Sequence, residues 1–233
     1  TEADFNADGS MKEGLPDQTQ VFPAGYEFAP GDVLYKDIDG DGKIKRQSNI
    51  DEKGDLSVIG NALPRMQFGL NLDASYKGFD FSAFFQGVAN RKLWAAGNQV
   101  LPGFTTGEPF YKGAEDYWTP ENTNAFYPRP MDYKQSQSGN YSLNDRYLLN
   151  MAYLRLKTLT VGYTLPKTWL SKYKVQGLRV YFTGENLFTI DGLKPAIDPE
   201  TGIRTAGTSS DSRNFGRSYP YQKTVSFGIQ LSL

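Results

Sequence analysis

The sequence contains no cysteine and no histidine. Without cysteine the chain can form neither disulfide bonds nor thiolate metal sites, and without histidine it lacks the commonest general base and the usual zinc ligands. Its 25 basic and 26 acidic residues nearly cancel. The basic excess typical of nucleic-acid-binding proteins is therefore missing, and we expect no nucleic-acid partner. No pair of acidic residues is singled out for catalysis by its spacing, so we predict that the protein is not an enzyme.

Long apolar runs are missing too. No stretch approaches the ~18 consecutive apolar residues of a membrane-spanning helix. The first residues, Thr1–Phe5, lack the basic and apolar segments of a secretory signal. The chain starts without methionine, from which we expect a processed chain or a fragment. These absences exclude a helical membrane protein but leave a β-barrel membrane protein open, because its signal per strand is much weaker.

Aromatic residues and glycine are abundant instead, with 15 Tyr, 15 Phe, 3 Trp and 24 Gly. Apolar side chains occupy every second position in five segments, which predicts β-strands at residues 67–76, 79–86, 153–165, 178–190 and 225–233. The two-residue connection Lys77-Gly78 predicts a β-hairpin between the first two strands. Leu154 and Leu156 lie on the opposite parity from the apolar residues that follow them, which indicates either a β-bulge in the third strand or a change in its environment.

The connections between these strands alternate in length. Residues 77–78 and 166–177 are short connections, whereas 1–66, 89–152 and 191–221 are long and polar. In an antiparallel meander this order places all short turns at one end of the sheet and all long loops at the other. Outer-membrane barrels have that asymmetry, and their tilted strands need about 9–11 residues to cross the bilayer. We therefore predict an all-β fold, an antiparallel transmembrane β-barrel.

Five strands do not complete such a barrel. Single-chain bacterial barrels have at least about eight strands and an even number of them, and open sheet edges are not tolerated in lipid. The sequence therefore predicts a fragment of about five strands from a larger barrel. The alternative is a soluble β-sandwich or lipocalin-like barrel, in which the apolar face of the same strands would point inward.

An acidic segment matches the first half of a calcium-binding loop. Asp37, Asp39 and Asp41 stand at alternate positions before Gly42, and Lys43 at the seventh position would contribute its backbone carbonyl. We predict a structural Ca²⁺ site here; the alternative is a solvated acidic turn without a metal.

The second half of the calcium-loop pattern fails. The twelfth position, which requires a bidentate glutamate, is Ser48. Closure of the site would need carboxylates further along the chain, at Asp51, Glu52 or Asp55. No helical pattern flanks the segment, so a calcium-sensing switch is not expected.

The last residues are similar to the C-terminal signal that the barrel-assembly machinery reads in bacterial outer-membrane proteins. Ser226, Gly228, Leu231 and Leu233 are the positions that carry this membrane-assembly pattern. The alternative is an ordinary amphipathic strand.

Many aromatic residues fall in the long connections. They could stack on sugars or hold peptide, but such residues more often pack a long loop against its neighbours, and we favour packing. Trp94 and Trp169 lie near strand ends, where an interfacial aromatic girdle is expected. The loop aromatics are Phe104, Phe110, Tyr111, Tyr117, Trp118, Phe126, Tyr127, Tyr133 and Tyr141.

Several segments together resemble, in order, the C-terminal part of SusC/RagA-type TonB-linked outer-membrane proteins. These segments are Gly31–Asp37, Asp39–Gly42, Val58–Pro64, Tyr153–Pro166, Gly184–Thr189 and Tyr219-Pro220. Compared with the family, the chain carries extra residues around Lys45–Ile50, which makes Asp55 the expected closing ligand of the acidic loop.

The resemblance implies a barrel of about 22 strands with an N-terminal plug and a TonB box, neither of which is in this chain. Residues 1–66 would then form an extracellular loop region with the acidic turn, and residues 67–233 the C-terminal barrel strands and their loops. The resemblance also implies four partners: the remaining N-terminal part of the barrel with its plug, the TonB complex through the absent N-terminal region, outer-membrane lipid, and a SusD-like surface lipoprotein.

The function that this resemblance implies is import across the outer membrane. Members of the family take up nutrient oligomers, glycans in many cases and peptides in others, and we expect the same class of substrate here. The competing hypothesis is a soluble, secreted carbohydrate-binding β-domain that uses the loop aromatics.

Overall fold

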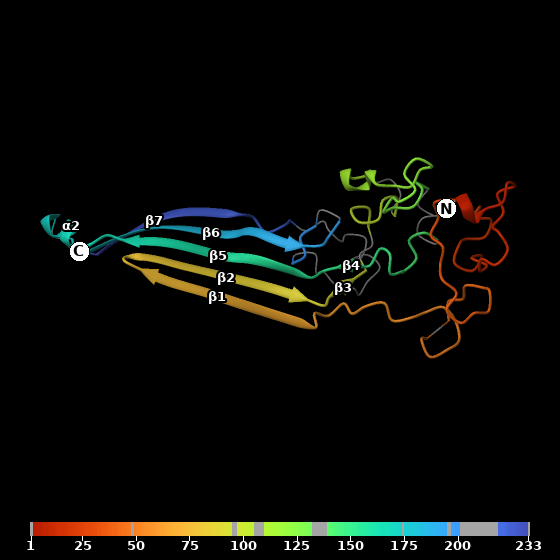
Figure 1. The fold of residues 1–233 in the computed structure, drawn as a ribbon, viewed down its shortest axis with the longest axis horizontal. Helices are drawn as coiled ribbons and strands as arrows, with labels where there is room; N and C mark the ends of the chain where they lie inside the picture. The colour runs from red at the N-terminus through yellow and green to blue at the C-terminus, as the bar shows by residue number, and fades with distance from the viewer. Residues whose placement is uncertain are drawn as a thin grey trace.

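The computed structural model describes residues 2–47, 49–94, 97–104, 110–131, 139–173, 175–194, 197–200 and 219–232. A long sheet occupies one half of the molecule and a layer of loops the other half (Figure 1). None of the helices in the described part of the chain is long and apolar enough to cross a lipid bilayer.

The sheet has five strands in the order β1-β2-β5-β6-β7, and each strand is antiparallel to its neighbours. This is the predicted meander. The strands are β1 (Met66–Tyr76), β2 (Phe79–Ala89), β5 (Tyr153–Thr164), β6 (Gly177–Asp191) and β7 (Thr224–Ser232). All five predicted segments are confirmed, with ends that shift by up to three residues.

The remaining elements are short. A two-stranded sheet pairs β3 (Lys92–Leu93) with β4 (Leu149–Asn150) inside the loop layer. The helices of the described residues are η1 (Glu2–Asp4), η2 (Lys112–Glu115), α2 (Lys167–Leu170) and η3 (Ser171–Tyr173).

Two adjacent rows of residues show how the sheet separates apolar from polar side chains. One row crosses all five strands at Ala74, Phe81, Val161, Phe182 and Phe227. Because successive side chains of a strand point to opposite faces, the neighbouring row belongs to the other face. That second row consists of Asp73, Ser82, Thr160, Thr183 and Ser226.

The apolar face is open to its surroundings. Phe81 is 39% exposed and Phe227 is 82% exposed. A soluble sandwich or small barrel would bury these side chains, so the exposure contradicts that alternative. Among the described strands, β1 and β7 each pair with one neighbour, which leaves two open edges of the kind expected for part of a larger barrel.

The predicted bulge is confirmed in β5. Phe84 of β2 pairs with Thr158, but the next residue, Phe85, pairs with Leu156, so Lys157 is the extra residue. The bulge returns Leu156 to the apolar face. In β6 the register against β5 shifts at the same level, and Asn186 there adopts φ of 51°, a left-handed conformation that asparagine tolerates better than most residues.

The described parts of the long connections lie at one end of the sheet, as predicted (Figure 1). The other end carries the tight turn between β1 and β2 and the short connection through α2. Lys77 and Gly78 both have positive φ, 47° and 87°, which matches a two-residue hairpin turn of the I′ type. Any binding surface built by the loops is therefore on one side of the membrane-crossing strands.

The loops have a hydrophobic core of their own. Its buried residues are Leu93, Val100, Leu101, Tyr127, Tyr141, Tyr147, Leu149 and Met151. Trp94 packs against this cluster and so contributes to the loop core. Trp169, in α2 at the opposite end of the sheet, is 65% exposed, as expected for a residue of an interfacial girdle.

Candidate functional site

The acidic loop brings three of its predicted ligands together. Carboxylate oxygens of Asp37, Asp39 and Asp55 all lie within 4.8 Å of one another. The side chain of Asp41 points elsewhere, since it forms an ion pair with Lys45 and accepts a hydrogen bond from the Lys43 amide at 3.0 Å.

Backbone amides donate hydrogen bonds to all three carboxylates, and Asp39 accepts one from the Asp41 amide at 3.2 Å. Asp37 accepts hydrogen bonds from the amides of Gly40 at 2.6 Å and Gly42 at 2.8 Å. Asp55 accepts them from Ile38 and Lys45, both at 2.6 Å, and so ties the two sides of the loop together. Each carboxylate oxygen keeps a second lone pair, so the cluster can still coordinate a cation.

The other residues predicted to belong to the acidic site are not part of the three-carboxylate cluster. Lys43 forms an isolated backbone bridge with Asp17, and the amide of the next residue, Ile44, donates to the Asp17 carbonyl at 2.9 Å. Ile44 is buried in a small cluster with Val21 and Phe22, which anchors the loop. Ser48 lies outside the described residues.

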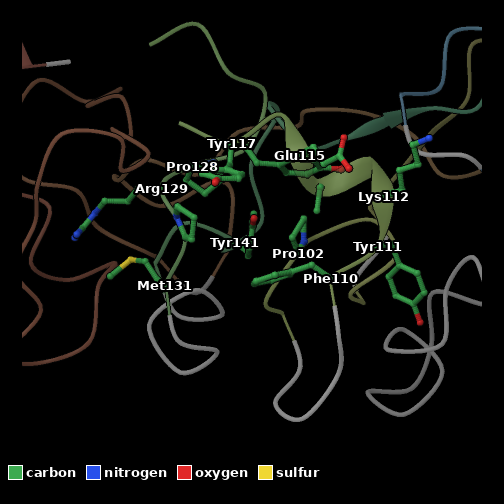
Figure 2. Close-up of a pocket in the computed structure, with 13 residues that line it drawn as sticks. Pro102, Phe110, Tyr111, Lys112, Glu115, Tyr117, Pro128, Arg129, Met131 and Tyr141 are labelled. Atoms are coloured by element: carbon green, nitrogen blue, oxygen red, sulfur yellow. The ribbon is translucent and has the colours of Figure 1, made fainter. Parts of the chain in front are cut away.

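A pocket of about 410 Å³ opens in the loop layer, a size typical of small-molecule sites (Figure 2). We call it the loop pocket. Its wall is largely apolar and aromatic, and it includes η2 at one side. Residues that define it are Pro102, Phe110, Tyr117, Tyr127, Pro128 and Tyr141.

Two buried tyrosines of the loop core also line this pocket. Tyr127 and Tyr141 are each only 4% exposed. Burial raises the pKa of Tyr127 to about 12, with a further contribution from the Asp116 charge. Burial, reinforced by the neighbouring tyrosines, likewise raises the pKa of Tyr141 well above its ordinary value. Both hydroxyls therefore stay protonated and can donate hydrogen bonds throughout the physiological pH range.

The charge of Arg129, at the pocket wall, is compensated by a buried carboxylate. Arg129 pairs with Asp32, whose side chain is fully buried, through Nε–Oδ1 at 2.9 Å and Nη2–Oδ2 at 3.0 Å. Asp32 also accepts hydrogen bonds from the Asn140 side chain and the Ala29 amide, both at 2.9 Å. These contacts hold the segment around residue 32 against the segment around residue 129.

A second ionic network joins the barrel wall to the β6–β7 connection. Arg155, on β5 just before the bulge, pairs with Asp198 at 2.8 Å and with Glu200 at 2.7 Å. Lys157, the bulge residue, reaches Glu200 at 3.0 Å. Although burial would raise the pKa of Asp198, hydrogen bonds from Arg155 and from the amides of Glu200 and Tyr221 outweigh it and lower that pKa.

This network escaped the sequence interpretation. Arg155 and Asp198 are far apart along the chain, and the residues around each give no sign that its side chain is buried or paired. The one available signal was the parity change at Leu154 and Leu156, since it places Arg155 on the polar face above the bulge.

The loop aromatics fall into two groups. Phe104, Phe126, Tyr127 and Tyr141 belong to the loop core or pack against it, as the favoured packing interpretation predicts. In contrast, the pocket residues Phe110, Tyr111 and Tyr117 are 59%, 40% and 40% exposed. Trp118 closely approaches Gly31, and Tyr133 lies outside the described residues.

Three of the four residues of the predicted membrane-assembly signal lie on β7. Ser226 belongs to the polar face, and Leu231 is 54% exposed. Gly228 lies beneath the ring of Tyr181, where any side chain would collide with it. Leu233 lies outside the described residues.

These features define a segment of a transmembrane β-barrel: an amphipathic antiparallel sheet, open at both edges, with its long loops at one end. No family model matches the chain. It is 33% identical over 206 residues to TonB-dependent receptor P3 of Formosa agariphila, a match that covers 87% of this chain and 19% of the relative. It is also 33% identical over 209 residues to TonB-dependent receptor P26 of the same organism, covering 87% and 20%.

Solved structures give the same result. A chain of the RagAB peptide importer in its closed-closed state superposes with a TM-score of 0.56 at 26% identity, over 83% of this chain and 20% of that one. A chain of the RagAB peptide transporter gives 0.54 at 26% identity, over 74% and 17%. The chain belongs to the TonB-dependent outer-membrane receptors of the SusC/RagA type, and it spans about a fifth of the length of these relatives.

Proposed function

We propose that the chain forms part of the barrel wall and the external loop layer of an importer that takes up nutrient oligomers, glycans or peptides. The observation that carries this proposal is the sorting of the structure into an amphipathic sheet and a one-sided loop layer (Figure 1). Residues 1–66 would belong to the extracellular loop region and residues 67–233 to the barrel strands with their loops. The relatives named above are receptors and transporters rather than enzymes.

The partners follow from the same proposal. The strands would pair with the rest of the barrel around a plug, and the TonB complex would drive transport through the N-terminal region of the full receptor. A SusD-like lipoprotein would cover the loop layer. Support comes from the open edges of β1 and β7 and from the exposed aromatic side chains of the loops.

The full-length receptor tests this function. It should be extracted from the outer membrane only by detergent, migrate as a heat-modifiable protein and co-purify with a lipoprotein. Cells that express it should take up a labelled oligosaccharide or peptide until the proton gradient is collapsed. A receptor that reaches the membrane but transports none of these solutes would overturn the proposal.

A pair of lysine substitutions tests which face meets lipid. Leu159, midway along β5, belongs to the apolar face and pairs with Ala83 and Gly184, whereas Thr160 belongs to the polar face. Leu159→Lys should destabilise the assembled receptor by about 2–4 kcal/mol, the cost of a charge on the lipid face near the bilayer midplane. Thr160→Lys should have little effect. Urea unfolding of both variants in lipid vesicles measures the difference, and equal sensitivity would mean that the apolar face does not contact lipid.

We also propose that Asp37, Asp39 and Asp55 hold a structural Ca²⁺ that fixes the acidic loop. Hard oxygen ligands suit this ion, and three carboxylates already converge there. When bound, the ion would cancel the repulsion among carboxylates that are partly buried.

Chelation provides the test of the Ca²⁺ site. In the full receptor, removal of Ca²⁺ by EGTA should accelerate proteolysis within residues 37–55 several-fold, and Asp55→Asn should do the same in the presence of Ca²⁺. Asp41→Asn is the matched control, because the Asp41 carboxylate pairs with Lys45 outside the cluster. Cleavage that is indifferent to chelation would leave a solvated acidic turn.

A further inference from the structure

We propose that the loop pocket binds an uncharged glycosyl ring of the imported oligomer. This inference rests on the proposed import function and adds a site and a ligand class to it. The pocket is formed by the described residues of the loop layer, at the end of the sheet where solute would enter (Figures 1 and 2).

The wall of the pocket offers flat apolar surfaces. Phe110 is 59% exposed there, although a phenylalanine gains free energy when it is covered. Proline rings from Pro102 and Pro128 flank it, and Figure 2 shows these residues grouped around the same space. A pyranose ring presents a face of C–H groups that can pack against such surfaces.

The uncharged polar side chains that line the pocket are tyrosines, with hydroxyl groups. Tyr127 and Tyr141 line the cavity, and neither hydroxyl forms a hydrogen bond with another described residue. Neither hydroxyl is fully enclosed by the protein, so each is free to hydrogen-bond to a ligand held in the cavity. Sugar hydroxyls can both accept and donate, which matches the capacity of tyrosine.

The charges of the pocket argue against an ionic ligand. Arg129 is neutralised by the buried Asp32, and the two charges of η2, Lys112 and Glu115, have opposite signs. The pocket therefore carries no net charge that would favour a ligand carboxylate or ammonium, either of which would lose hydration on entry.

The pocket is also poorly suited to a peptide backbone. Peptides held by main-chain pairing need exposed amide donors on the protein. Pro102, Pro128 and Pro130 supply three positions of the wall and have no amide hydrogen. An uncharged ring with an apolar face and a hydroxylated edge can contact both the apolar wall and the tyrosine hydroxyls, whereas an extended peptide would find few amide donors there.

Binding to the full-length receptor in detergent tests the inference. The probes are maltohexaose, laminarihexaose, xylohexaose and mannohexaose as neutral oligosaccharides, an alginate hexamer as a charged one, and a pentapeptide mixture. Isothermal titration should detect at least one neutral oligosaccharide. Phe110→Ala should weaken its binding about tenfold, and Tyr141→Phe about threefold to tenfold, the value of one hydrogen bond.

The variants should leave the fold intact, since Phe110 is exposed and the Tyr141 hydroxyl has no hydrogen-bond partner among the described residues. Tyr219→Ala is the matched control for loss of an exposed aromatic outside the pocket, because Tyr219 is 94% exposed. Binding of no neutral probe, unchanged affinity in both pocket variants, or pocket-dependent binding of alginate or peptide overturns the inference. If uptake persists in any of these cases, the import function stands and only the ligand assignment fails.

Discussion

Arg155→Met is expected to destabilise the junction between the barrel wall and the β6–β7 connection by about 3–5 kcal/mol. The side chains of Arg155 and Asp198 are 4% and 5% exposed, and that of Glu200 is 15% exposed. Removal of the guanidinium breaks the ion pairs of Arg155 with Asp198 and Glu200, whereas the Lys157–Glu200 pair remains. Methionine retains much of the volume, so the loss comes mainly from the broken buried ion pairs.

Hydrogen exchange in the full receptor measures this effect, as faster exchange of residues 153–157 and 219–223. Arg179→Met is the matched control, because it breaks an ion pair with Asp80 whose side chains are 26% and 38% exposed. Exposed pairs contribute little, so this control should change exchange only slightly. Adding Asp198→Asn and Glu200→Gln to Arg155→Met should restore part of the protection. Equal changes in exchange for Arg155→Met and Arg179→Met would show that burial does not increase the contribution of the Arg155 ion pairs to stability.

Gly31→Ala should disrupt the base of the loop layer. Gly31 has φ of 92°, a conformation that costs other residues about 1–2 kcal/mol. A Cβ atom there would lie 2.6 Å from two ring atoms of Trp118 and 3.1 Å from the Cβ of Arg129. Relief of that overlap costs about 1–3 kcal/mol more and displaces the segment that carries Arg129.

Gly25→Ala separates the two contributions. Gly25 has a similar φ of 79°, but a Cβ atom there has nothing within 4 Å. Gly25→Ala should therefore show only the free-energy cost of placing alanine in this backbone conformation. Limited proteolysis of the full receptor should therefore cut the loop layer faster in Gly31→Ala than in Gly25→Ala. Equal cleavage rates would mean that the indole moves aside without cost.

The strands could be predicted because their information is local. A strand of this sheet needs only alternating side chains, and alternation is visible in any one segment, as in Val225 to Leu231. The order of short and long connections then fixed the meander. A bulge in the first half of β5 could also be anticipated, since an extra residue changes the parity of its neighbours, but its position at Lys157 came from the structure.

The loop layer could be predicted only in part. The acidic pattern located Asp37 and Asp39, but the preference for Asp55 came from the family resemblance, and the separate role of Asp41 depends on its pairing with Lys45. Sequence patterns also gave no way to divide the loop aromatics. Tyr141 is buried and Phe110 is exposed because of contacts with residues far away in the chain.

The sequence by itself thus determined the amphipathic strands, their order and the side of the sheet on which the loops lie. All of these follow from periodicity and connection length, which are properties of neighbouring residues. Only the tertiary structure revealed the Arg155–Asp198 ion pair, the Arg129–Asp32 ion pair and the loop pocket with its two tyrosine hydroxyls. Irregular loops have no repeating geometry, so their contacts are set by how distant segments pack together rather than by any local pattern.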